Sequence, residues 1–358
     1  MHKEPFLKMS RRDRVSLKLS ILVRLAALAL ALLLCALVIF LLVRMNPVDV
    51  YKAIVDGAVG SSRRLWTTIR DTMVLLCISL GLAPAFRMRF WNIGAEGQVL
   101  VGGAAAAALM IYVGDALPTP ILLIAMLLAS ALAGMLWGLL PAVFKAYWRT
   151  NETLFTLMMN YIAMQVVTFC IVFWENPKGS NTVGIINQST QAGWLPELFG
   201  LKYGWNVVIV FALTMIMYVY LRYSKQGYEV AVVGESEDTA RYVGINVKKV
   251  ILRTMSISGA ICGIAGFIIV SGASHTISTA TADGRGFTAI IVAWLSHFNS
   301  FFMLIVSFAI VFMDQGAVQI ASQYGLNENA SDVLLGIILF FMIGAEFFIK
   351  YKVERTRK

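Results

Sequence analysis

The chain has 358 residues, of which 59% are hydrophobic and 14% charged, and its mean hydropathy is +0.75. Soluble domains carry about 25% charged and about 45–50% apolar residues, so the composition excludes an ordinary soluble domain and indicates a protein that lies in lipid. The formal net charge of +10 does not indicate a nucleic-acid partner, because many basic residues flank the apolar part of the chain, as in membrane proteins.

Long apolar stretches separated by short polar joints follow one another along the chain. A helix needs about 20 apolar residues to cross the hydrocarbon core, and in lipid its backbone groups must be hydrogen-bonded within the segment. The sequence therefore predicts an all-α integral membrane protein with a bundle of about ten transmembrane helices. The predicted spans, which together form a permease-like domain over residues 21–349, are 21–43, 68–86, 92–113, 120–144, 153–174, 205–223, 251–270, 286–298, 301–321 and 331–349.

Both ends of the chain are basic, and the positive-inside rule places both in the cytoplasm. The first span is too long for the apolar region of a signal peptide and is followed by no small-residue cleavage pattern, so we expect it to be retained. Arg63 and Arg64 are exceptions, because they fall in an outer loop. The basic residues of the segment 1–20 and the tail 350–358 are Lys3, Lys8, Arg11, Arg12, Arg14, Lys18, Lys350, Lys352, Arg355, Arg357 and Lys358.

The chain contains no motif that indicates an enzyme, a cofactor or a metal site. No GxxxxGK[S/T] loop is present to hold ATP phosphates, and no His, Cys or acidic cluster has zinc-ligand spacing. The cysteines fall in apolar stretches and are interpreted as small buried hydrophobes. The residues concerned are His2, His275, His297, Cys35, Cys77, Cys170 and Cys262.

The third predicted span opens with the sequence NIGAEGQ at residues 92–98. Polar residues at membrane depth are costly and indicate function, and here Asn92, Glu96 and Gln98 alternate with small residues that leave the backbone accessible. Two interpretations are open: these side chains belong to a substrate pathway, or they cap a helix at the cytoplasmic mouth.

The fifth span opens with Asn151 and Glu152, and Asn160 lies deeper in the same span. Asn151 is expected to cap the helix, whereas Asn160 fits either the pathway or an interhelical hydrogen bond. Small residues let helices approach closely in lipid, so the two GxxxG pairs, Gly134/Gly138 and Gly259/Gly263, predict helix packing.

Two connections are longer than the others. The outer stretch 175–204 is rich in Asn, Gly, Pro and Ser and is expected to form a small external cap. Within the inner loop 224–250, residues 234–244 predict one short helix, with Ser236 as its N-cap and Gly244 as its stop.

Further charged residues lie in the last third of the chain. The eighth segment is short, which is typical of a partial or re-entrant helix. Asp283 and Arg285 precede it and fit either a local ion pair or a substrate contact. Asp314 and Gln315 interrupt the ninth span and need partners or water there.

Four stretches resemble, in order, the permease subunits of bacterial ABC importers of the simple-sugar and nucleoside branch, which is related to the branched-chain amino-acid and ribose permeases. These stretches are NIGAEGQ at 92–98, TNETLFTLMMNYIA at 150–163, GESEDTARYVGINV at 234–247 and GRGFTAIIVAWL at 284–295. The resemblance extends from about residue 65 to residue 349, and NIGAEGQ is most similar to the larger permease of guanosine-type importers. One departure is that Ser296, His297 and Phe298 stand where the family has a glycine-led turn.

The resemblance implies a type II importer permease in the bacterial cytoplasmic membrane. Its expected partners are a cytoplasmic ABC ATPase, a second permease subunit and an extracellular substrate-binding protein, which is a lipoprotein or periplasmic. A coupling helix would dock on the ATPase, and by position its residues would be Glu235, Asp238, Arg241 and Gly244. The candidate pathway residues are Asn92, Glu96, Gln98, Asn160 and Asp314.

Three alternatives remain at this point. A simple sugar such as ribose or galactose could replace a nucleoside as the substrate. An ion-coupled secondary transporter would need paired broken helices and titratable residues at the midplane, for which Asp314 is the one candidate. A structural membrane protein would leave the inner loop unexplained. Dependence on a separate ATPase distinguishes these classes.

Overall fold

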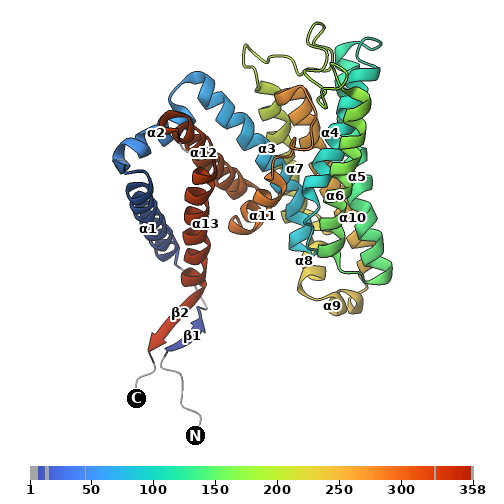
Figure 1. Ribbon diagram of the computed structural model, residues 1–358. Coiled ribbons are helices and arrows are strands. Elements are labelled where there is room, and N and C mark those ends of the chain that lie inside the picture. The colour runs from blue at the N-terminus through green and yellow to red at the C-terminus, as the bar shows by residue number, and fades with distance from the viewer. Residues whose placement is uncertain (1–6, 13–15, 45, 326–327, 356–358) are drawn as a thin grey trace. The chain divides into compact units, whose positions relative to one another are not determined.

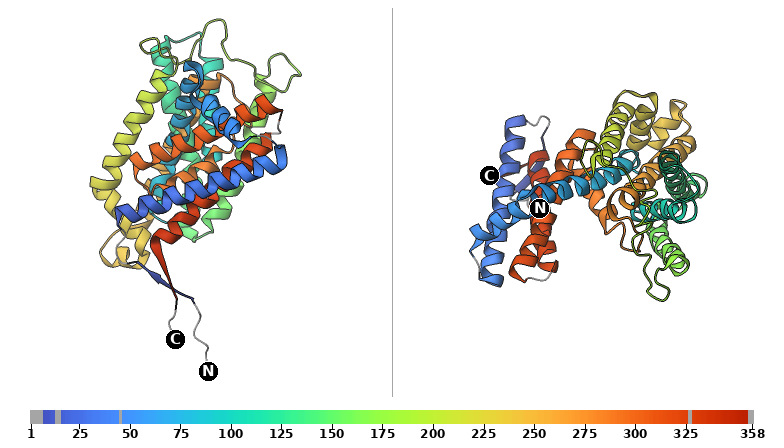
Figure 2. Two further views of the ribbon diagram at one scale, coloured as in Figure 1. Left: turned by 90° about the vertical axis from the view of Figure 1, so that its left-hand side faces the viewer. Right: turned by 90° about the horizontal axis from the view of Figure 1, so that it is seen from above.

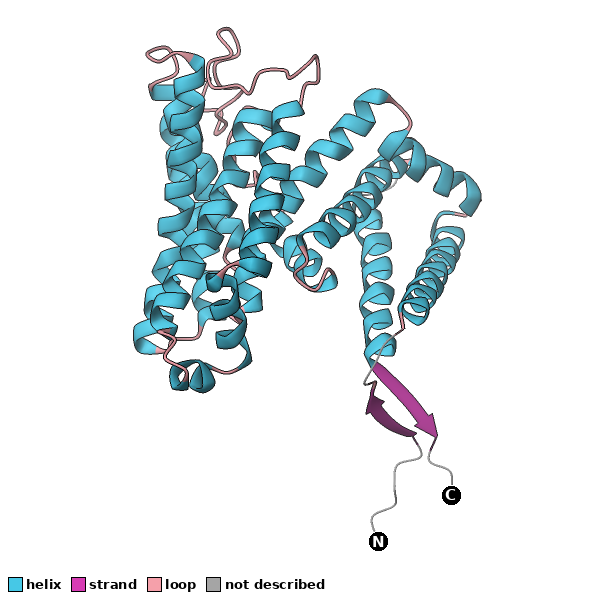
Figure 3. Cartoon of the chain, turned by 180° about the vertical axis from the view of Figure 1, so that it is seen from behind, coloured by secondary structure: helices cyan, strands magenta, loops and turns pink. Residues whose placement is uncertain are grey.

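The computed structural model describes residues 7–12, 16–44, 46–325 and 328–355. Most of the described chain is helical (Figure 3), so the predicted all-α class is confirmed apart from one short two-stranded ribbon. Lys3, Arg14, Arg357 and Lys358 of the basic ends lie outside the described residues. The chain divides into two compact units: Met1–Thr68 with Ala309–Lys358, called the first unit here, and Ile69–Phe308, called the second unit.

The first unit contains the helices at the two ends of the chain. They are α1 (Leu17–Val43), α2 (Pro47–Val59) and α13 (Glu328–Lys350), together with the start of α3 and the end of α12. Helices α1 and α13 lie side by side (Figure 2) and share a buried apolar core that includes Cys35 and Ile338. Strand β1 (Leu7–Arg11) pairs antiparallel with β2 (Tyr351–Arg355), so that Leu7 faces Arg355.

Helix α2 was not predicted, although its start is visible in the sequence. The Asn46 side chain accepts a hydrogen bond from the Val48 N–H at 3.0 Å, and Pro47 occupies the first helical position, where a proline costs no hydrogen bond. The following turn is held by an ion pair between Arg64 and Asp56 at 2.6 Å, which gives one of the two discordant outer arginines a partner.

The second unit is a helical bundle with the inner loop at one end and the irregular stretch 175–203 at the other (Figure 1). Helix α10 packs against both α4 and α5 at its centre. The helices are α3 (Ser62–Arg87), α4 (Ala95–Tyr112), α5 (Thr119–Trp148), α6 (Glu152–Trp174), α7 (Gly204–Tyr223), α8 (Lys225–Glu235), α9 (Glu237–Tyr242), α10 (Val247–Ile269), the π-helix η1 (Val270–Ser274), α11 (Arg285–Leu295) and α12 (Ser300–Tyr324).

Within the described residues, seven helices are long and apolar enough to cross a membrane, namely α3, α4, α5, α6, α7, α10 extended by η1, and α12. The other three predicted spans correspond to shorter apolar helices, Leu25–Leu41, Arg285–Leu295 and Gly336–Ile349. The chain is therefore a multi-pass membrane protein, while the number of ten spans is not confirmed.

The centre of the second unit depends on glycines at the helix crossings. A Cβ added to Gly134 on α5 would lie 2.7 Å from the Gly263 Cα of α10, and one added to Gly102 on α4 would lie 2.5 Å from the same atom. The Gly259 position is blocked in the same way by the Gly134 carbonyl. These contacts confirm that the two GxxxG pairs pack helices against each other.

Candidate functional site

Helices α4 and α11 both begin inside the bundle, and the Glu96 side chain joins their starts. One carboxylate oxygen accepts a hydrogen bond from the Gly284 N–H and the other from the Gly286 N–H, each at 2.8 Å. The Glu96 residue is 3% exposed. A carboxylate at a helix N-terminus satisfies free N–H groups and complements the helix dipole. Glu96 therefore caps α11, a helix about 190 positions away in the sequence.

Helix α11 is only half of a membrane span. Its 11 residues are about 16 Å long, whereas the hydrocarbon core is about 30 Å thick. The chain from His275 to Gly284 is irregular, and Gly284 has a φ of +68°, which glycine adopts without strain. Irregular backbone at this depth must be covered by protein or line a water-filled cavity.

Asn92 and Gln98 form a second buried cluster at the start of α4. Their side-chain amides hydrogen-bond each other in both directions, at 3.4 Å and 3.3 Å, and the Asn92 amide also donates to the Ser258 hydroxyl at 3.2 Å. Ser258 lies three turns into α10, about 16 Å along its axis. The cluster therefore lies well inside the bundle and not at the end where α10 begins.

Helix α6 holds the backbone of the same segment. The Asn160 side chain accepts from the Gly97 N–H at 2.9 Å and donates to the Ile93 carbonyl at 2.9 Å. Thr156 accepts from the Ile93 N–H at 3.1 Å. The predicted interhelical hydrogen bond of Asn160 is thus confirmed, as is the cap formed by Asn151, which accepts from the Leu154 N–H at 3.2 Å.

A buried ion-pair cluster beside α11 was missed by the sequence analysis. Asp71 on α3 is 4% exposed; Arg70 binds both of its oxygens, at 2.9 Å and 3.0 Å, and Arg285 reaches it at 3.4 Å. The Arg70 guanidinium also lies over the Tyr203 ring, 5.3 Å from its centre. A local ion pair with Asp283 was one of the two alternatives that the sequence left open for Arg285, and the structure instead pairs this arginine with a carboxylate 214 positions away.

Aromatic side chains meet at the other end of α11. The Trp91 and Trp294 rings are stacked with centroids 5.6 Å apart, and Phe86 contacts both rings edge-on. The following turn has His297 and Phe298 at φ values of +49° and +59°. Both values lie in the left-handed region that favours glycine, which agrees with the glycine-led turn expected there.

The structure brings four of the five candidate pathway residues together, namely Asn92, Glu96, Gln98 and Asn160. All four are buried and hydrogen-bonded within the chain. Asp314 lies on α12 in the part that belongs to the first unit and has an interaction partner of its own.

The inner loop contains two helices where one was predicted. Gly234 and Glu235 end α8, and α9 is a separate helix of 6 residues. Ser236 has an extended backbone, with a φ of −159°, and this separates the two helices, while Gly234 packs against the end of α3, where a Cβ would overlap the Arg87 carbonyl. Ser236 caps α9 by accepting from the Thr239 N–H at 3.2 Å, as predicted. Gly244, with a φ of +82°, ends this segment as predicted.

Helix α9 presents charged and aromatic side chains away from the bundle. Arg241 binds Glu237 at 2.8 Å and Asp238 at 3.0 Å, and all three side chains are exposed. Tyr242 is 92% exposed. An aromatic residue with so much free surface is typical of a protein-binding site, and the sequence analysis did not select it.

The external stretch 175–203 is fastened to the end of α10. The Trp194 ring stacks on the His275 ring with centroids 3.8 Å apart, and the Ile186 N–H donates to the His275 carbonyl at 2.9 Å. Burial, together with the charge of Lys202, lowers the pKa of His275 to about 4. Among the described residues, no group of three or more His, Cys, Asp or Glu side chains could hold a metal ion.

The second unit thus combines two helix starts buried inside a bundle of membrane-length helices with an exposed short helix at one end. Residues 65–343 match the family described as branched-chain amino acid transport system / permease component. The chain belongs to this family of membrane permeases.

Three relatives extend over most of the chain. It is 29% identical to the guanosine ABC transporter permease protein NupP of Bacillus subtilis, covering 86% of this chain and 88% of the relative. It is 28% identical to the glucose ABC transporter permease protein TsgB13 of Haloferax volcanii, covering 86% and 83%. It is 25% identical to the nucleoside ABC transporter permease protein NupB of Lactococcus lactis, covering 94% of each chain. No solved structure matches the chain.

Proposed function

We propose that this chain is the membrane-spanning subunit of an ATP-driven importer that carries nucleosides into the cell. The observation that carries the proposal is the similarity, over 86% and 94% of the chain, to permeases named for guanosine and for nucleosides. The chain itself is the transport subunit and has no nucleotide-binding loop, so ATP hydrolysis falls to a separate ATPase.

Helix α9 is the proposed contact with that ATPase. It is short and exposed, and both of its neighbours are fixed in place. The end of α8 packs against the end of α3 at Gly234, and Asn246 caps the start of α10 by accepting from the Lys249 N–H at 3.1 Å. Glu235, Asp238, Arg241 and Gly244 remain the proposed coupling residues. We add Tyr242 to them because its ring is the most exposed aromatic side chain of the inner loop.

The buried polar residues have a positioning role in this proposal. Glu96 fixes the start of α11, while Asn92, Gln98 and Asn160 fix the start of α4. Two helix starts held at membrane depth resemble the discontinuous helices that form substrate sites in other transporters. The pathway would therefore run beside these starts, with the four side chains setting its shape. Asp314 stays a candidate pathway residue.

The remaining parts of the proposed importer are a second, paralogous permease and an extracellular binding protein. Both follow from the family, and the assembly would lie in the bacterial cytoplasmic membrane. The basic residues Lys145, Arg149, Lys248 and Lys249 gather at the end of the bundle that carries α9, which supports placing that end in the cytoplasm.

The test is uptake of radiolabelled guanosine in cells that lack the chain, with and without a plasmid that restores it. We expect guanosine uptake to require both the chain and its ATPase. An excess of unlabelled nucleosides should abolish this uptake by competition. A simple sugar is the second candidate because the glucose permease relative matches 86% of the chain. Competition by glucose and none by nucleosides would favour the sugar, and uptake without any ATPase would overturn the importer proposal.

A further inference from the structure

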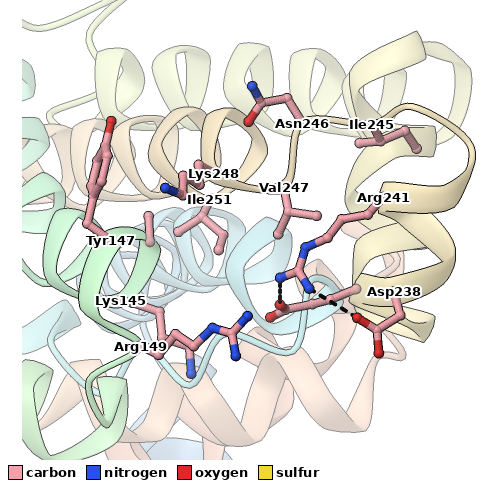
Figure 4. Close-up of a pocket in the computed structure, with 12 residues that line it drawn as sticks. Lys145, Tyr147, Arg149, Asp238, Arg241, Ile245, Asn246, Val247, Lys248 and Ile251 are labelled. Atoms are coloured by element: carbon pink, nitrogen blue, oxygen red, sulfur yellow. Dashed lines mark hydrogen bonds and ion pairs between the residues drawn. The ribbon is translucent and has the colours of Figure 1, made fainter.

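Two adjoining hollows open at the inner ends of α5 and α10. The larger has a volume of about 990 Å³ and lies between the end of α5, helix α9 and the start of α10 (Figure 4). The smaller, of about 330 Å³, runs along the first three turns of α10 past Leu252 and Ser256. Tyr147, Asn246 and Lys248 line both hollows, so that these residues form their common wall.

Positive charge dominates this region. Lys145 is paired with Glu152 at 2.7 Å, and Arg241 is paired with acidic residues of its own helix. Three further basic side chains of this region form no ion pair with an acidic side chain of the described chain, namely Arg149, Lys248 and Lys249. Three uncompensated basic side chains at one mouth attract an anion.

The backbone at the start of α10 adds to the positive potential of this region. Lys248 and Lys249 occupy the first turn of α10, where the helix dipole is positive and basic side chains are unfavourable. Asn246 satisfies one of the free N–H groups there, but it adds no negative charge. A bound anion would relieve the repulsion among these groups, so the arrangement favours an anionic ligand over an empty hollow.

The rim of the region is aromatic and apolar. Tyr147 and Trp148 end α5 and are 56% and 66% exposed, and the Lys248 ammonium lies 4.6 Å from the centre of the Tyr147 ring. One turn deeper, Phe144 and Leu140 are exposed on the same helix. Tyrosine and tryptophan are enriched where a membrane protein crosses the headgroup layer, so the anion would lie at that level and next to acyl chains.

We propose that this region, called the α5–α10 mouth, binds the headgroup of an anionic phospholipid. Arg149, Lys248 and Lys249 would hold the phosphate, Tyr147 and Trp148 would flank the glycerol, and the acyl chains would follow Phe144 and Leu140. The charge complementarity and the aromatic rim favour this occupant over an acidic protein segment, which would gain nothing from an apolar path into the membrane. The inference does not depend on the transported substrate.

The test measures lipid binding to the purified full chain by native mass spectrometry. Phosphatidylglycerol and phosphatidylcholine with identical acyl chains are titrated against the wild-type chain and against a variant carrying R149Q, K248Q and K249Q. We expect the wild type to prefer phosphatidylglycerol by about 100-fold and the triple variant to lose nearly all of that preference, since each basic side chain near an anionic surface contributes about 1 kcal/mol, or about fivefold in affinity.

The matched control removes three exposed basic residues from the same end of the bundle, through R89Q, R222Q and K225Q. None of these residues lines either hollow, so the control should keep the wild-type preference. A conservative variant with R149K, K248R and K249R should also keep it, which separates loss of charge from loss of fold. Equal binding of the two lipids by the wild type, or equal loss in the control, would overturn the proposal.

A second measurement identifies the occupant in native membranes. A photoreactive benzoylphenylalanine placed at position 148 should crosslink to phospholipid. Crosslinking to a partner polypeptide with no lipid adduct would show that a protein covers the α5–α10 mouth, and the lipid assignment would then be wrong.

Discussion

Glu96 and Gly286 are in direct contact although they are 190 positions apart in the chain, with the carboxylate accepting the Gly286 N–H at 2.8 Å. A Cβ on Gly286 would lie 2.6 Å from the Glu96 backbone nitrogen, so no larger residue fits there without displacing α4. The family-typical stretches NIGAEGQ and GRGFTAI are therefore two halves of one structural unit, in which an acid on one helix requires a glycine on the other.

Replacing Glu96 tests this unit. In Glu96→Ala, two buried N–H groups lose their acceptor, and we expect the free energy of unfolding to fall by at least about 2 kcal/mol. Glu96→Gln keeps one carbonyl oxygen and should lose about 1 kcal/mol. The thermal unfolding midpoints of the purified proteins give the order wild type, Gln, Ala; an alanine variant as stable as the wild type would refute the capping role.

Because α5 and α10 are in close contact, we expect one added methyl group at their crossing to lower the free energy of unfolding markedly. Gly259→Ala would push the new Cβ against the Gly134 carbonyl, and overpacking of this kind costs about 1–3 kcal/mol. Gly336→Ala on α13 is the control, because its Cβ would meet no atom within 4 Å. Thermal unfolding should separate the two variants, and equal midpoints would argue against close packing at this crossing.

The coupling proposal predicts loss of transport without loss of stability. Arg241→Ala, Glu235→Ala and Tyr242→Ala change exposed side chains, so the free energy of unfolding should change by less than about 0.5 kcal/mol. Guanosine uptake and substrate-stimulated ATP hydrolysis should nevertheless fall to background. Lys225→Ala, which changes an exposed residue of the neighbouring α8, should keep both activities. Full uptake by the α9 variants would remove the coupling assignment.

The His275 environment predicts an acid-sensitive external cap. The folded protein lowers the pKa of His275 to about 4 from an ordinary value near 6.5, so between these pH values the unfolded chain binds more protons. Stability from this group is therefore complete above about pH 6.5 and is lost as the pH falls toward 4. His275→Phe keeps a ring against Trp194 and should flatten this part of the pH profile of the unfolding midpoint; a profile as steep as that of the wild type would contradict the role of His275.

The turn after α11 offers a stabilising substitution. His297 has a φ of +49°, and a side chain in this region costs about 1–2 kcal/mol. We expect His297→Gly to raise the free energy of unfolding by about 1 kcal/mol. His297→Ala removes the same imidazole without giving glycine's freedom, so it should not share the gain. If alanine stabilises as much as glycine, the imidazole and not the backbone is responsible.

Local features of this chain could be predicted from its sequence. The apolar runs predicted the helices. Asn151 and Ser236 could be predicted as caps because the N–H group that each one accepts lies only three positions further along the chain. The shortness of the eighth segment was also visible. Each of these properties depends on neighbours within one or two helical turns.

The connections between distant segments could not be predicted in the same way. Nothing in the spacing shows that Arg285 binds Asp71 or that Glu96 caps α11, because the partners are 214 and 190 positions apart. Asp283 is nearer to Arg285 in the sequence, but the fold brings Asp71 to Arg285 and the ion pair forms there. Helix α2 was missed for a different reason: its 13 residues are too few to cross a membrane, so its apolar content does not mark it as a span.

Helix α10 has a mechanical consequence. A short turn that contains Gly244, at a φ of +82°, joins it to the exposed helix α9. From Val247 it runs without interruption for 23 residues, about 35 Å, before η1 contacts the stretch 175–203 through Ser271, whose carbonyl accepts the Leu195 N–H at 3.0 Å. A stiff rod fixed at both ends transmits a displacement instead of absorbing it. With the orientation proposed above, a displacement of α9 would therefore be carried along α10 to the stretch 175–203 at its other end.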